Sequence, residues 1–223
     1  DGSFGTYLCV VDSCNYRIQL INPGNGQVVR TVGRPGARFG ELSSPSSIGY
    51  DPRRPGRPVV FAATNVGPED RRVMAFDLES WRLNDSTPEG TGKTEMDAPE
   101  GMCVTEGKMY VVDTANSRIV AFDTSTLKKA GQYPPVHWVN SPVCRIPKHM
   151  QLDNPQDIAA HEGELFVSDT HNDRIQVFTT GLEHIGTIGQ KGKGPGQFQY
   201  PRGVCIARSG SRAPALLYVA EQT

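Results

Sequence analysis

The sequence predicts an all-β protein made of repeated four-stranded units. One motif recurs about every fifty residues along the 223-residue chain, and a second motif, led by proline, lies between its copies. No segment shows a helical apolar stripe over 11 or more residues. Four-stranded sheets repeated around an axis protect most sheet edges, as β-propellers do. We therefore expect a β-propeller.

The first motif is an apolar run that ends on an acidic residue, followed by Asn and Arg and then a second apolar run. Clear copies span residues 8–21, 110–122 and 166–178. In a blurred copy Thr64 takes the place of the acidic marker, and Glu221 ends the apolar run of a fifth copy. The spacing of these markers, about fifty residues, is in the range of propeller blades.

The second motif begins with proline, has an aliphatic residue three positions later and then a small residue. Proline is tolerated as the first residue of a strand, because its missing N–H need not enter the ladder. The small residues at one register predict crowding between units on the innermost strand. The prolines are Pro45, Pro99, Pro155 and Pro201, and the small residues are Gly49, Cys103, Ala159 and Cys205.

Each unit is expected to contain four strands separated by Gly, Pro, Asn and Asp turns. In order they are the proline-led strand, the run that ends at the marker, the Arg-led run, and a weaker strand such as 27–32 or 184–188. The expected units span residues 1–44, 45–98, 99–154, 155–200 and, in part, 201–223.

These motifs resemble the NHL repeat. The resemblance rests on residues 110–122 and 166–178, on the glycine- and phenylalanine-containing segment 189–204, and on a similar segment at 33–45. The second unit departs from the pattern at Thr64, and the third carries an insertion around residues 133–150. NHL propellers commonly have six blades. The markers give about four blades and part of a fifth, which predicts a fragment of a six-bladed propeller. The alternative is a small propeller whose terminal strands pair to close the ring.

The NHL resemblance implies an interaction platform for protein or RNA, and in a minority of cases an enzyme. The enzymes are peptidyl-amidating lyases, which would need metal-binding histidines near the proline-led strand. No histidine follows the prolines here; the residues are Ser46, Glu100, Gln156 and Arg202. We therefore expect a non-enzymatic protein scaffold without cofactor or metal. An RNA-binding propeller and a lyase-like enzyme are the alternatives.

The acidic markers and the arginines that follow them are expected to build the repeat. Their presence in every regular unit favours a structural role, with Asp and Asn shaping the turn and Arg pairing with a carboxylate. The set comprises Asp12 with Arg17, Asp113 with Arg118, and Asp169 with Arg174.

Binding residues are expected in the loops, which carry most determinants on rigid scaffolds. No acidic residue lies between His184 and Val219, whereas this stretch and an earlier loop are rich in Lys and Arg. We predict one basic rim that docks an acidic protein or RNA; the alternative is an ordinary solvated loop. Its members are Arg53, Arg54, Arg57, Lys191, Lys193, Arg202, Arg208 and Arg212. Trp138, in the 133–150 insertion, is a further candidate, either at an interface or covering a blade.

Composition bounds the remaining possibilities. The net charge of -1 argues against a protein that binds nucleic acid or a membrane over its whole surface. Five cysteines without paired spacing favour a reducing compartment, and we expect a cytoplasmic protein. There is no apolar run of 18 residues, so no membrane association is expected. An open propeller edge would need further blades or a partner to cover it.

Overall fold

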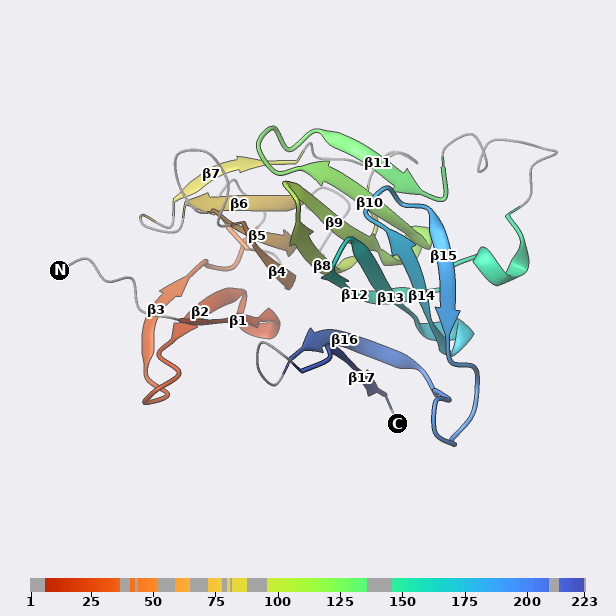
Figure 1. Ribbon diagram of the computed structural model, residues 1–223. Helices are drawn as coiled ribbons and strands as arrows, with labels where there is room; N and C mark the ends of the chain where they lie inside the picture. The colour runs from red at the N-terminus through yellow and green to blue at the C-terminus, as the bar shows by residue number, and fades with distance from the viewer. Residues whose placement is uncertain are drawn as a thin grey trace. The chain divides into compact units, whose positions relative to one another are not determined.

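The computed structural model describes residues 7–36, 41–42, 44–51, 59–64, 72–77, 80, 82–87, 96–135, 146–208 and 213–222. Within these residues the structure consists of β-strands, turns and short 3-10 helices (Figure 1). The strands form antiparallel sheets, three of them four-stranded, and neighbouring strands follow chain order. The prediction of an all-β chain with four-stranded units is confirmed. The chain divides into two compact units, residues 1–99 and 100–223.

The first unit holds a three-stranded and a four-stranded sheet. Ile18 and Leu20 from the first sheet pack with Met74 and Phe76 from the second, and Leu42 from the connection between them is also buried. The strands are β1 (Leu8–Asp12), β2 (Arg17–Ile21), β3 (Val28–Val32), β4 (Pro45–Asp51), β5 (Val59–Thr64), β6 (Val73–Asp77) and β7 (Leu83–Ser86), and a 3-10 turn, η1, spans Ser13–Asn15.

The second unit holds two four-stranded sheets and the two-stranded sheet β16–β17. The first sheet comprises β8 (Pro99–Thr105), β9 (Lys108–Asp113), β10 (Arg118–Asp123) and β11 (Lys129–Tyr133). The second comprises β12 (Pro155–His161), β13 (Glu164–Asp169), β14 (Arg174–Thr179) and β15 (His184–Ile188), and is followed by β16 (Pro201–Ala207) and β17 (Leu216–Glu221). Short 3-10 turns are η2 (Thr114–Asn116), η3 (Lys148–Met150) and η4 (Thr170–Asn172).

An apolar core joins the two four-stranded sheets of the second unit. Val112 and Ile119 from one sheet and Leu165 from the other are fully buried in it. The rings of Tyr133 and Phe178 meet edge to face, with centroids 4.6 Å apart. Alternate residues of these strands face the core, which is why the apolar runs of the motif carry bulky residues at every second position.

The hydroxyl residue that follows each of the three aspartate markers, Asp12, Asp113 and Asp169, bonds one sheet to the next. The hydroxyl of Thr114 donates to the Pro155 carbonyl at 2.7 Å, and that of Thr170 donates to the Pro201 carbonyl at 2.7 Å. In the first unit Ser13 makes the same bond to the Pro45 carbonyl at 2.6 Å. The two motifs are therefore coupled: the marker motif of one unit anchors the proline that opens the next.

Two sheets of the second unit approach closely at Gly101 of β8, two residues before the predicted small residue Cys103. An added Cβ at Gly101 would stand 2.5 Å from the Asp157 Cα of β12. Cys103 is half-buried and packs against the core, and burial raises the pKa of its thiol. Cys205, another of the small residues predicted at the crowded register, is exposed. Its neighbour Val204 points into the contact with β12 and β13, and alternation along β16 turns Cys205 away.

Asp157 bridges β12 to β16 through its carboxylate. Its Oδ2 accepts the Val204 backbone N–H at 2.9 Å, and its Oδ1 accepts the N–H of Ile158 at 2.9 Å. Burial raises the pKa of this carboxyl group, and the two hydrogen bonds offset part of that rise. Asp157 occupies the position that Gly101 and Gly203 take in the neighbouring proline-led motifs, where glycine has no side chain to form such a contact.

His184 gives the second unit an acid-sensitive contact. Its ring Nε2 bonds the side-chain oxygen of Gln176, and burial, followed by the nearby His149 and Arg174, lowers the pKa of the imidazole. The unfolded chain, with an ordinary His pKa of about 6.5, therefore takes up a proton before the folded chain does. The free energy of unfolding should fall as the pH drops below about 6.5 and continue to fall through the lowered folded pKa.

Urea unfolding of the wild type and of His184→Gln at pH 7.5 and 5.5 tests this expectation. The loss of stability between the two pH values should be smaller in the variant, because glutamine does not titrate. Asp157 is present in both proteins, so its opposing pH dependence cancels in the comparison. Equal losses in the two proteins would show that folding does not lower the pKa of His184.

Candidate functional site

The repeated Asp and Arg side chains form local struts in the turn between the second and third strands of a sheet. The Asp113 carboxylate accepts from Arg118 Nε at 2.5 Å and from Asn116 at 2.9 Å. Asp169 and Arg174 lie in the same arrangement at 2.7 Å, as do Asp12 and Arg17. The carboxylates of Asp113 and Asp169 are fully buried, so these side chains stabilise the fold and cannot contact a ligand in solvent.

The connection between β15 and β16, residues 189–200, is a folded loop that presents charged side chains. Phe198 packs over Gly189, where an added Cβ would lie 2.3 Å from the ring, and the positive φ of 78° at this position also favours glycine. The Phe198 N–H donates to the Gln190 carbonyl at 2.9 Å, and the Gly192 N–H donates to the Phe198 carbonyl at 3.1 Å. These bonds hold the loop in one shape, while Lys191 and Lys193 remain exposed on it.

Tyr200 ends this loop beside a lysine and a carboxylate. The Lys191 ammonium lies 3.2 Å from Asp173 Oδ2 and 5.9 Å from the centroid of the Tyr200 ring. The other Asp173 oxygen accepts the Tyr200 N–H at 2.9 Å. The ring of Tyr200 is nonetheless 49% exposed, and the His171 ring lies edge-on to it at 6.4 Å. Asp173 thus fixes both the lysine and the backbone that carries the tyrosine.

Arg202 is a third cation close to this group in the sequence. It follows Tyr200 by two residues, is exposed, and donates to the side-chain oxygen of Gln222 at 3.3 Å. We call the set the lysine–tyrosine surface. It comprises His171, Lys191, Lys193, Tyr200 and Arg202.

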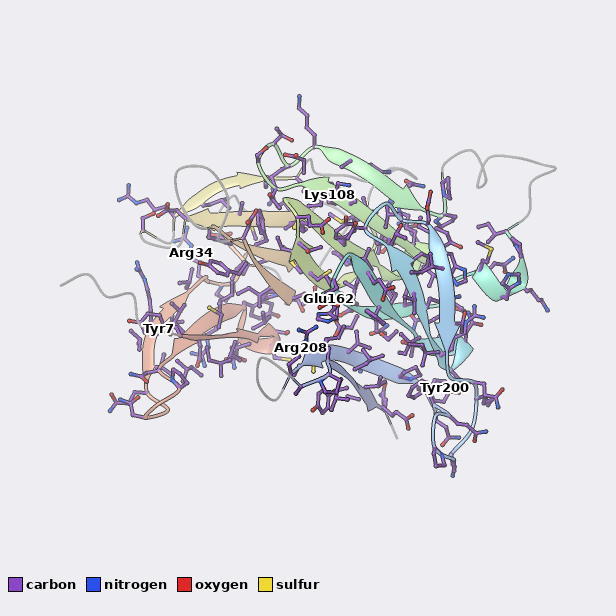
Figure 2. All side chains as sticks on the ribbon, in the orientation of Figure 1. Tyr7, Arg34, Lys108, Glu162, Tyr200 and Arg208 are labelled. Atoms are coloured by element: carbon purple, nitrogen blue, oxygen red, sulfur yellow. The ribbon has the colours of Figure 1, made fainter. Side chains whose placement is uncertain are left out.

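The structure brings together only part of the predicted basic rim. Arg208 lies at the far end of β16 from Tyr200, where it pairs with Glu162 and donates to the His161 ring at 3.2 Å (Figure 2). Arg208 directly follows the seven-residue strand β16, whereas Lys191 lies in the loop that precedes this strand. The length of the strand therefore separates the two side chains. Arg53, Arg54, Arg57, Trp138 and Arg212 lie outside the described residues.

Two members of the surface, His171 and Tyr200, were not singled out from the sequence. His171 sits within the Asp-x-x-Asn turn at a position that differs between units, and its ring also lies 3.3 Å from an Asp153 oxygen. Tyr200 and Asp173 both adopt positive φ, 50° and 54°, which directs the chain around this corner. The sequence did contain a signal for such positions. A residue that differs between copies of a repeated turn is not required to build that turn, so it is available for binding.

Metal-ligating side chains do not gather in the part of the chain that the structure describes: no three His, Cys, Asp or Glu residues there come close enough to share an ion. Among the same residues there is no helix with the length and apolar character needed to span a bilayer.

Comparison with known proteins places the fold. Residues 152–178 match the family model described as NHL repeat. No curated protein sequence matches the chain. One similar solved structure is selenomethionine-substituted virginiamycin B lyase from Staphylococcus aureus, which shares 15% identity with this chain; the match covers 90% of this chain and 57% of the lyase, with a TM-score of 0.59. Another is Kuenenia stuttgartiensis hydrazine synthase, which shares 10% identity; the match covers 91% of this chain and 49% of the synthase chain, with a TM-score of 0.58.

A third similar structure is the catalytically inactive variant of the Staphylococcus aureus lyase with quinupristin. It shares 14% identity over 96% of this chain and 59% of that one, with a TM-score of 0.59. The chain therefore spans between 49% and 59% of these neighbours. At such identities the likeness concerns the fold alone.

The prediction that the protein is not an enzyme is wrong as an inference from this fold. Virginiamycin B lyase, an enzyme, is among the structures it resembles, and hydrazine synthase is another. The missing histidines after the prolines argued against one class of lyase only, and a propeller scaffold can carry many different sites.

The prediction of a β-propeller fold is confirmed, and the NHL resemblance is confirmed over residues 152–178. The sheets follow the four-stranded antiparallel order of propeller blades, and the solved structures they resemble are propeller-like. Residues 152–178, which run from just before β12 to near the end of β14, match the repeat by sequence. The chain is an all-β, propeller-type protein that carries an NHL repeat.

Proposed function

We propose that the chain is a protein-interaction module and that the lysine–tyrosine surface binds an acidic segment of its partner. The observation that carries the proposal is Tyr200, which is 49% exposed and lies beside Lys191. Tyr and Arg are enriched among the residues that dominate binding energy at protein interfaces. Lys191 is paired with Asp173, and the exposed Lys193 and Arg202 add two positive charges that an acidic segment could meet.

The surface is preorganised, which favours binding. Loop 189–200 is held by its own backbone bonds, and Asp173 fixes Lys191 and the Tyr200 backbone at 3.2 and 2.9 Å. A partner would therefore order few additional groups on this side, and that lowers the entropic cost of association.

A protein partner is favoured over single-stranded RNA because of the aromatic content. Sequence-tolerant RNA binding stacks successive bases on several aromatic side chains. Here Phe198 packs over Gly189, which leaves Tyr200 as the exposed aromatic ring of the loop. One ring with flanking cations suits an acidic peptide that carries an apolar residue.

Affinity capture with three forms of the chain tests the proposal. Tyr200→Ala combined with Lys193→Glu should lose the captured partner, with an affinity reduced at least about tenfold. Lys128→Glu, an exposed lysine in the β10–β11 turn, is the charge-matched control and should retain it. Nuclease treatment should leave the captured proteins unchanged, and the amount captured should fall as the salt concentration rises.

Two outcomes would overturn the proposal. Recovery that is equal for all three forms would place binding elsewhere on the chain. A difference that disappears after nuclease treatment would show that the surface binds RNA. Thermal unfolding of the double variant should match that of the wild type, because both substituted side chains are exposed.

A further inference from the structure

One member of the lysine–tyrosine surface, His171, is of a residue type that ordinarily changes its charge close to neutral pH. It lies in the 3-10 turn η4, between the buried marker Asp169 and Asp173. The corresponding turns hold Cys14 in η1 and Ala115 in η2, and neither of these side chains is basic. Among the three turns, a group that can gain a positive charge therefore occurs in the one that contributes to the surface.

The imidazole of His171 is held in place by contacts on both of its nitrogens. Its Nδ1 lies 3.3 Å from Asp153 Oδ1, and its Nε2 lies 3.1 Å from Asn154 Nδ2. The backbone N–H of His171 also donates to the Asp153 carbonyl at 3.2 Å. Asp153 is fixed in turn, because its own N–H donates to Asp169 Oδ1 at 2.7 Å. The ring therefore has a defined position although the side chain is 50% exposed.

These contacts can accommodate both the neutral and the cationic ring. A neutral ring with its hydrogen on Nδ1 donates to Asp153 and accepts from the Asn154 amide. A cationic ring carries hydrogen on both nitrogens, so it keeps Asp153 and needs an acceptor at Nε2. Rotation of the Asn154 amide brings its oxygen to that place. Protonation thus changes the charge of the ring without removing the ring from the surface.

The groups around His171 place its charge beside the exposed tyrosine. The Tyr200 ring lies edge-on to the imidazole, with centroids 6.4 Å apart. The Lys191 ammonium lies 5.9 Å from the centroid of the same tyrosine ring and 3.2 Å from Asp173 Oδ2, and the Asp153 carboxylate lies beside the imidazole itself. A ligand that contacts Tyr200 therefore comes within the field of both His171 and Lys191.

We propose that protonation of His171 strengthens the binding of an acidic segment to the lysine–tyrosine surface, so that the interaction tightens as the pH falls. The inference rests on the proposed function, because it concerns the same surface. Opposite charges about 6–8 Å apart in water attract enough to change a dissociation constant about threefold. Histidine is ordinarily neutral at about pH 7.5 and cationic at about pH 5.5. Binding should therefore be about threefold tighter at the lower pH in dilute buffer, and the difference should shrink as salt is added.

A blocked, labelled peptide of aspartates around a single phenylalanine is the probe. Aspartate is ordinarily ionised at both pH values, so the charge of the peptide stays nearly constant. Fluorescence anisotropy with the wild-type chain should show the threefold tightening. His171→Gln, which cannot take up the proton, should bind equally at the two pH values. His171→Lys, which carries a permanent charge, should bind at pH 7.5 about as tightly as the wild type does at pH 5.5.

A second histidine supplies the matched control. His161 contacts Arg208, which lies at the far end of β16 from Tyr200, so His161→Gln should keep the full pH dependence. The proton itself gives an independent readout. Calorimetry near pH 6.5 in two buffers of different ionisation enthalpy should show that the wild type takes up protons when it binds the peptide, and that His171→Gln does not.

The outcomes separate this inference from the proposed function. If Tyr200→Ala combined with Lys193→Glu abolishes binding but wild type and His171→Gln respond equally to pH, the role of His171 is overturned and the proposed function stands. If the wild type binds the peptide at neither pH, both are overturned. Weaker binding at pH 5.5 than at pH 7.5 would also overturn the role of His171, because the added charge would then have the wrong effect.

Discussion

Replacing Arg118 with methionine should lower the free energy of unfolding by about 3–5 kcal/mol, because the Asp113 carboxylate would be left buried without its cation. Arg118 Nε lies 2.5 Å from Asp113 Oδ2, and the exposed fractions of the two side chains are 9% and 0%. Methionine keeps much of the length of the apolar part of arginine. The loss of stability would therefore come from the unpaired charge on Asp113 and not from a cavity. Urea unfolding followed by far-ultraviolet circular dichroism measures the change.

The same substitution at Arg17 is the matched control. Arg17 and Asp12 make the equivalent contact at 2.7 Å, but the arginine side chain is 39% exposed. Water and salt screen such a pair, so Arg17→Met should cost a small fraction of the loss at Arg118. Asp113→Asn added to Arg118→Met should recover part of the stability, since it removes the stranded charge. If the double variant is no more stable than Arg118→Met, the buried charge is not the cause.

Replacing Gly101 with alanine should be the second large effect, a loss of about 1–3 kcal/mol from forced displacement of two sheets. The new Cβ would lie 2.5 Å from the Asp157 Cα and 2.8 Å from the Gln156 carbonyl oxygen. Both are backbone atoms, which a rotamer change cannot move aside. The same displacement would strain the bond from Val204 to Asp157, so β16 should loosen as well.

Gly186→Ala in β15 is the control for Gly101→Ala. No heavy atom lies within 4 Å of a Cβ built on Gly186, and its φ lies outside the left-handed region. This substitution should leave stability unchanged or raise it by about 0.4–1 kcal/mol, because alanine reduces the entropy of the unfolded chain. Hydrogen exchange can localise the effect: protection should fall in β12 and β16 for Gly101→Ala only. A stable Gly101→Ala protein would mean that the two sheets separate readily.

The sequence predicted the strands well because each strand has its own local signal. The fourth strand predicted at 184–188 is observed at His184–Ile188, and the one predicted at 27–32 is observed at Val28–Val32. Alternation of apolar residues and turn chemistry act over a few residues, so they can be recognised without knowing the fold.

The candidate site was predicted only in part, because it depends on which strand end carries each loop. Lys191 and Arg202 were chosen from charge alone and lie on one surface. Arg208 was chosen by the same criterion but lies at the other end of β16, beside Glu162. Tyr200 matters through its exposure and its contact with Lys191, and neither can be recognised from residue type.

The sequence by itself determined the repeated, all-β, propeller-type architecture, because the period of its motifs is a property of the chain alone. Only the tertiary structure decided how the motifs are used. It showed that the hydroxyls after Asp12, Asp113 and Asp169 bind the carbonyl of the next proline. It also showed that two sheets approach closely at Gly101, and that Glu221 is exposed where Asp169 is buried. These outcomes depend on contacts between strands far apart in sequence, and no local pattern encodes such contacts.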